Sequence, residues 1–134
     1  MVKTTTTKKP ARKTKSDGSK ELALIVAQAA FDTKAENIAV LDIKKVGGFT
    51  DYFVIATAMS DRQAQAICDR ILDALKKQSP QPIRPLSVEG YETGHWILID
   101  CGSVIAHIFY EETRTFYGLE KLWGDAPRIH FKLL

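Results

Sequence analysis

The sequence predicts an α/β fold: a single domain in which packed helices cover one mixed, roughly five-stranded sheet. Three observations predict it. Two segments carry apolar residues at helical spacing, several short apolar runs are typical of strands, and two of those runs flank Gly102-Ser103 as in a β-hairpin. The elements follow the order α-β-β-α-β-β-β-α, which favours one sheet with helices packed on it. A chain of 134 residues has room for one such domain.

The first half of the domain is expected to hold one helix and two strands. The helix runs from about Ser19 to Thr33, with apolar residues spaced three and four apart. Residues 37–43 are predicted to form a buried strand. Residues 53–56 form a second strand, because their nearly continuous apolar run is typical of a strand covered on both faces.

A second helix and an edge strand come next. Ser60 and Gln63 have the spacing of a capping box, which predicts the helix start. The apolar stripe that follows comprises Ala64, Ile67, Cys68, Ile71, Leu72 and Leu75. Prolines at positions 80, 82 and 85 exclude a longer helix, so residues 83–88 are predicted to form an edge strand.

The hairpin and a last helix complete the prediction. Residues 96–101 and 104–109 flank Gly102-Ser103, and glycine in the first of two turn positions fits a type II′ turn. The last helix is expected from Glu111 to about Leu122, ended by Gly124 and Pro127.

A two-residue turn sorts the hairpin side chains onto two faces, because paired residues point to the same side. The face expected to join the core is apolar and carries Ile97, Ile99, Cys101, Val104, Ala106 and Ile108. The other face is mixed and carries Trp96, Leu98, Asp100, Ile105, His107 and Phe109.

Two interpretations of the mixed face stay open. Aromatic residues beside a few polar groups have the composition of an interface core, which predicts a partner-binding surface at Trp96, Leu98, Asp100, His107 and Phe109. Glu112, Tyr117 and Glu120 of the last helix would extend that surface. Alternatively, the last helix covers the face and Asp100 bonds to His107 or to a backbone amide, since a buried carboxylate needs a partner.

The charge is divided unevenly along the chain. Seven of the 19 basic residues and one of the 16 acidic residues lie in the first 20 positions, which gives that segment +6 and leaves −3 on the remainder of a chain whose net charge is +3. Residues 1–18 are therefore predicted to be a disordered basic tail, either solvating or in weak contact with RNA. Residues 19–124 form the predicted domain, and residues 125–134 a C-terminal extension.

Several function classes find no support in the sequence. It has no apolar run of membrane length and no secretory signal, and Cys68 and Cys101 sit in apolar patterns, which together predict a cytoplasmic protein. The phosphate-binding glycine motifs are absent, and His95, His107 and His130 do not have metal-ligand spacing. We therefore expect no enzyme, cofactor or metal.

Six stretches in register carry a family resemblance that covers about residues 19–123. They are residues 39–42 (AVLD), 49–55 (FTDYFVI) with 60–62 (SDR), 88–90 (VEG), 96–100 (WILID), 102–109 (GSVIAHIF) and 116–123 (FYGLEKLW). In this order and at these spacings the chain resembles the ribosomal silencing factor family, also called Iojap. Ser103 stands where the family usually has an aspartate, and residues 1–18 and the end after Pro127 lie outside the family pattern.

The resemblance implies a translational repressor. Family members bind the large ribosomal subunit through ribosomal protein number fourteen and block joining of the small subunit when nutrients are scarce. Their fold is similar to that of nucleotidyltransferases without the catalytic residues, they need no cofactor, and they are often homodimers when free. The alternatives are a nucleotidyltransferase-like protein with residual nucleotide binding, and an RNA-binding module that relies on the basic tail.

Overall fold

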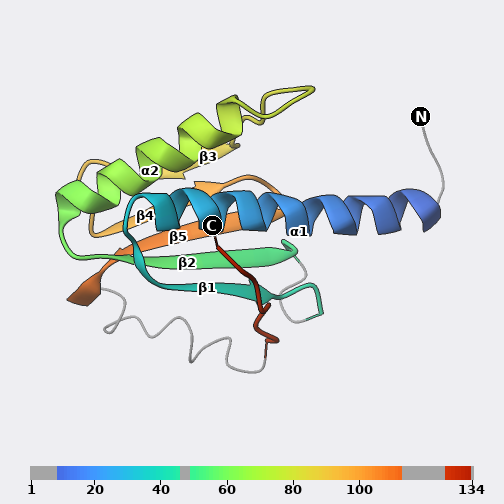
Figure 1. Ribbon diagram of the computed structural model, residues 1–134, viewed down its shortest axis with the longest axis horizontal. Coiled ribbons are helices and arrows are strands. Elements are labelled where there is room, and N and C mark those ends of the chain that lie inside the picture. The colour runs from blue at the N-terminus through green and yellow to red at the C-terminus, as the bar shows by residue number, and fades with distance from the viewer. Residues whose placement is uncertain (1–8, 46–48, 113–125, 134) are drawn as a thin grey trace.

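The sheet is built around β2 (Tyr52–Ala58), in which all seven residues are buried, as the apolar run predicted. In the computed structural model, which describes residues 9–45, 49–112 and 126–133, five strands lie in the order β1-β2-β5-β4-β3 (Figure 1). β2 and β5 (Val104–Tyr110) run parallel, whereas the pairs β1–β2, β5–β4 and β4–β3 are antiparallel. The prediction of a mixed, roughly five-stranded sheet is confirmed.

Two helices pack on one face of this sheet, α1 (Lys9–Asp32) and α2 (Asp61–Lys76). At the start of α2, the Ser60 hydroxyl accepts a hydrogen bond from the backbone N–H of Gln63 at 3.0 Å. The Gln63 side chain accepts one from the backbone N–H of Met59 at 2.7 Å. The predicted helix cap is therefore present, although the second bond reaches one residue further back than in a standard capping box.

The start of α1 differs from the prediction. The helix begins at Lys9, ten residues before Ser19, so it includes residues 9–18, which the sequence predicts to be part of a disordered tail. Pro10 does not prevent this start, because proline is tolerated in the first turn of a helix, where the backbone N–H has no partner within the helix.

The core has two parts, one on each face of the sheet. The larger part fills the space between the sheet and the helices and includes Val26, Ala27 and Ala30 of α1, Ile67 and Ile71 of α2, and Ile97, Ile99 and Ile108 of the hairpin. The smaller part lies on the opposite face and comprises Leu41, Ile43, Phe53, Ile55, Ile105, Phe109 and Ala126, with Trp96 and Leu98 packed against it.

β3 (Ser87–Glu89) is an edge strand, as predicted, but it is shorter than the expected range of 83–88. Ile83 does not pair in the sheet. Its backbone N–H donates instead to the Leu75 carbonyl of α2 at 2.9 Å. The prolines on both sides of Ile83 supply no N–H for a sheet ladder, so pairing begins only after Pro85.

The C-terminal segment is attached to the sheet. β1 (Glu36–Asp42) exchanges backbone hydrogen bonds with it, from Asp42 N–H to the Pro127 carbonyl and from Ile129 N–H to the Val40 carbonyl, each at 2.8 Å. Figure 1 shows this segment passing from β1 toward α1, and Ile129, Phe131 and Leu133 pack against the helix-side core. Residues 126–133 therefore belong to the folded unit.

Candidate functional site

The hairpin of β4 (Trp96–Asp100) and β5 has the predicted register. Trp96 pairs with Phe109, Leu98 with His107, and Asp100 with Ile105. Gly102 sets the turn with a φ of 85°, a value that favours glycine. Because the register is as predicted, the apolar residues of the hairpin point to the helices and the mixed residues point to the opposite face of the sheet.

The mixed face is only partly open to solvent. Trp96, Leu98 and Asp100 are half-buried, whereas His107 and Phe109 are 4% and 0% exposed. The two buried residues thus lie beneath the surface and support it. Glu112 is exposed, and Tyr117 and Glu120 lie outside the described residues together with most of the predicted last helix.

Aromatic rings form a continuous cluster on this face. The indole of Trp96 stacks on Phe109 with ring centroids 5.0 Å apart, and His107 meets Phe53 edge to face at 4.7 Å. The Trp96 Nε1–H donates a hydrogen bond to His107 Nδ1 at 3.1 Å. We call Phe49, Trp96, Leu98 and Asp100, with these buried rings beneath them, the aromatic face.

His107 is held in its neutral form. Burial lowers the pKa of His107 to about 4, because desolvation disfavours the charged imidazolium. Since Nδ1 accepts from Trp96, the proton of the neutral ring sits on Nε2. Nε2 is buried and has no hydrogen-bond partner among the described residues.

Asp100 bonds to a backbone amide, as the alternative interpretation of the mixed face anticipated. Its Oδ1 accepts from the N–H of Gly102 at 2.8 Å, which ties the carboxylate to the hairpin turn. This bond explains how an acid is tolerated beside aromatic rings. The carboxylate remains partly exposed, and an ionised carboxylate can accept further hydrogen bonds from an outside donor.

Phe49 belongs to the aromatic face but is not among the predicted binding residues. Its side chain is 57% exposed, and its ring centroid lies 5.9 Å from that of Phe53. The available signal was a large aromatic residue directly after the glycine pair 47–48, which indicates a loop, because binding residues are found disproportionately on loops.

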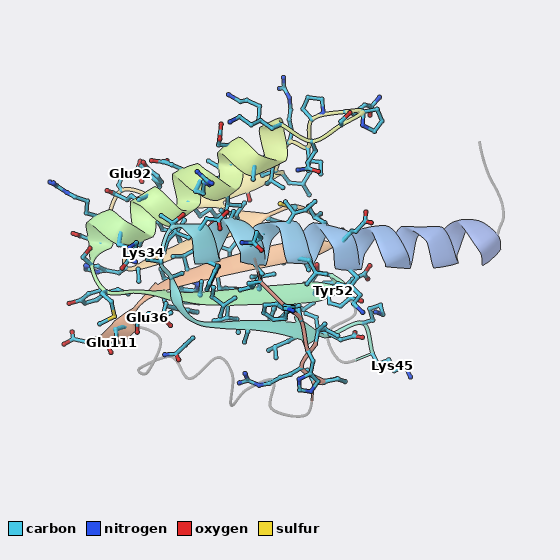
Figure 2. All side chains as sticks on the ribbon, viewed as in Figure 1. Lys34, Glu36, Lys45, Tyr52, Glu92 and Glu111 are labelled. Carbon is cyan, nitrogen blue, oxygen red and sulfur yellow. The ribbon has the colours of Figure 1, made fainter. Side chains whose placement is uncertain are left out.

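Charged side chains lie at both ends of the sheet. Figure 2 places Glu36 and Glu111 at one end and Lys45 at the other. The end with the two glutamates is where β1 begins and β5 ends, and Glu112 directly follows Glu111 there. Glu36 of β1 and Glu111 therefore lie at the same end of the sheet, where Figure 2 also places Lys34.

Neither a cluster of metal-ligating side chains nor a helix that could span a membrane is found in the part of the chain that is described. Within residues 9–45, 49–112 and 126–133, no three His, Cys, Asp or Glu residues gather closely enough to hold a metal ion. None of the described helices combines the length and the apolarity that a membrane span needs.

The fold and the half-exposed aromatic face define a small α/β protein with a candidate protein-binding surface. The family model described as "Ribosomal silencing factor during starvation" matches residues 16–134. The chain is 40% identical over 108 residues to the ribosomal silencing factor RsfS of Bacillus subtilis, covering 81% of this chain and 89% of the relative. This chain therefore belongs to the ribosomal silencing factor family.

A solved structure and a more distant relative agree with this assignment. A crystal structure of a Bacillus halodurans protein superimposes with a TM-score of 0.72 at 35% identity, over 84% of this chain and 99% of that one. The mouse protein named "Mitochondrial assembly of ribosomal large subunit protein 1" is 33% identical over 66% of this chain and 39% of its own length.

Family membership supports a ribosome-silencing role, which is that of a regulatory protein rather than an enzyme. One sequence-based expectation needs correction. The family model extends to residue 134, so the end after Pro127 is part of the family pattern. The pairing of residues 127–129 with β1 gives the physical reason, because this segment contributes to the fold.

Proposed function

We propose that this protein silences ribosomes by binding the large ribosomal subunit, through its ribosomal protein number fourteen, and by sterically blocking the small subunit. Membership in the silencing family supports the ribosome as target. The mouse relative is named for assembly of the large ribosomal subunit, which favours that subunit over the small one. The mechanism requires only that the bound protein overlap a docking surface, so an interface of modest size is sufficient.

The observation that carries this proposal is the aromatic face. An exposed Phe49 and half-buried Trp96 and Leu98 lie over a rigid layer of buried rings, with the Asp100 carboxylate beside them. A ribosomal protein carries basic side chains because it lies against RNA. An aromatic ring with a neighbouring carboxylate can offer an arginine both a surface for stacking and a charge-assisted hydrogen bond.

The proposed binding residues are those of the hairpin together with three from the segment after β5. We propose that Trp96, Leu98 and Asp100 make contacts and that His107 and Phe109 support them from below. Glu112, Tyr117 and Glu120 are proposed to extend the surface with acidic and aromatic groups.

Co-sedimentation with purified large subunits tests this assignment. Asp100→Asn keeps an oxygen that can accept from Gly102 N–H but removes the charge, and Phe49→Ala removes an exposed ring. Each variant is expected to bind at least about tenfold more weakly, with near-normal thermal melting. The matched control is Phe31→Ala, which removes a 46% exposed ring from α1 on the other side of the sheet. If Phe31→Ala weakens binding as much as Phe49→Ala, the aromatic face is not the binding surface.

We propose two further properties of the free and bound protein. The basic N-terminal segment adds a weak contact to ribosomal RNA, which salt should suppress steeply and deletion of residues 1–18 should abolish. In the cytoplasm the free protein forms a homodimer, which sedimentation equilibrium measures directly. An affinity for the ribosome that does not change with salt would contradict the RNA contact. A monomer at micromolar concentration would contradict the homodimer.

A further inference from the structure

The contact between Trp96 and His107 joins the two strands of the hairpin beneath the aromatic face. His107 pairs across the sheet with Leu98, and Trp96 lies two residues before Leu98 on the same side of β4. The indole therefore reaches the imidazole diagonally, with Nε1 3.1 Å from Nδ1. The same indole stacks on Phe109 at 5.0 Å, so two residues on the same face of β5 contact one partly buried ring.

Core packing alone does not explain why position 107 holds a histidine. The ring is 4% exposed, and its Nε2 has no hydrogen-bond partner among the described residues. A buried donor without an acceptor is unfavourable, and such groups are rare in folded proteins. A phenylalanine here could make the same ring contacts with Phe53 and Phe109 without an orphaned N–H. What histidine adds is an acceptor at Nδ1.

We infer that His107 is a positioning residue, whose Nδ1 lone pair holds the Trp96 indole in the orientation that the ribosomal partner meets. The inference rests on the proposed function of the aromatic face. An aromatic side chain that is already oriented in the free protein loses less conformational freedom on binding. His107 thus acts on affinity through Trp96, although it is itself buried.

Two substitutions separate the acceptor from the ring. His107→Phe keeps a ring between Phe53 and Phe109 but removes the acceptor. His107→Asn loses the ring but keeps a hydrogen-bond acceptor. The Oδ1 of asparagine is bonded to Cγ, as Nδ1 is in histidine. A residue that serves only packing would tolerate phenylalanine better than asparagine in every assay. If His107 positions Trp96, His107→Phe should be the more stable of the two variants, whereas His107→Asn should bind the large subunit more tightly.

The first readout does not involve the ribosome. The indole N–H resonance of Trp96, assigned by its loss in Trp96→Phe, reports the hydrogen bond directly. In His107→Phe this resonance is expected to move away from its native position while the melting temperature stays close to native. In His107→Asn the resonance is expected to stay near its native position while the melting temperature falls. An unmoved resonance in His107→Phe would overturn the inference.

The second readout is affinity for the large subunit. His107→Phe is expected to bind about three- to tenfold more weakly, and His107→Asn closer to the native protein. If His107→Asn does not fold, a cycle with Trp96→Phe replaces it: His107→Phe should have no added effect once the indole N–H is gone. Equal binding of His107→Phe and the native protein, or fully additive losses in the cycle, would contradict the inference. Failure of the native protein to bind would instead reject the proposed function and leave the resonance test intact.

Discussion

Acidification should destabilise this protein through one buried group, His107. The group is neutral in the folded state because burial lowers its pKa from 6.5 to about 4. In the unfolded chain the same imidazole is solvated and takes up a proton below about pH 6.5. Between these two values the unfolded state binds more protons than the native state, so the free energy of unfolding decreases as the pH falls.

The size and range of the effect follow from these two pKa values. The stabilisation from neutral His107 is fully present above about pH 6.5 and is lost as the pH falls through the folded-state value near 4. At about 1.36 kcal/mol per pKa unit, the loss amounts to about 3 kcal/mol. A domain of this size has a free energy of unfolding of roughly 5–15 kcal/mol, so the loss is a large fraction of the total.

Urea denaturation at pH 7.0, 5.5 and 4.5 measures the effect, with His107→Phe as the control. Other groups titrate over the same range, but they do so in both proteins and cancel in the difference. The native protein should lose about 2–3 kcal/mol more than His107→Phe over this interval. Parallel losses in the two proteins would show that the imidazole does not titrate as a buried neutral group, and the reasoning would be wrong.

Two further predictions concern stability. Deleting residues 126–134 removes the backbone hydrogen bonds to β1 and a set of apolar contacts, so the melting temperature should fall by many degrees. An unchanged melting temperature would mean that the segment is not docked in solution. Gly90→Ala should destabilise strongly, because its φ is +81° and an added Cβ would lie 2.1 Å from the Trp96 carbonyl oxygen. The control is Gly18→Ala, on an exposed part of α1 where an added Cβ would meet nothing within 4 Å. This substitution should stabilise the protein by about 0.5–1 kcal/mol, and equal effects at the two glycines would contradict the geometry.

The hairpin could be predicted in detail because its sequence contains every determinant of its register. Gly102 marks a two-residue turn, and alternation along both strands then assigns each side chain to a face. The nearly continuous apolar run of β2 likewise predicted a strand covered on both faces. Local pattern and final packing agree in these elements, which is why the sequence was sufficient.

Other features depend on contacts between distant segments and leave little local trace. Residues 126–133 show no strand periodicity, and the proline at position 127 argues against a strand. The carbonyl of Pro127 nevertheless accepts a hydrogen bond from the backbone N–H of Asp42 in β1. The bond between Trp96 and His107 is diagonal, so pairing rules that match residues directly opposite do not reveal it. The burial of Phe109 and His107 could not be predicted from face assignment alone. Alternation along a strand assigns a side chain to one face of the sheet but does not indicate how deeply that side chain is buried.

Subunit joining in the presence of this protein tests directly whether it silences ribosomes by keeping the small subunit off. Purified small and large subunits are mixed at a magnesium concentration that normally joins them, with an excess of the native protein or of Asp100→Asn, and are separated on a sucrose gradient. The native protein is expected to shrink the joined-ribosome peak and to sediment with the large subunit. Asp100→Asn at the same concentration should leave most of that peak in place. An undiminished joined peak with the native protein would contradict the claim.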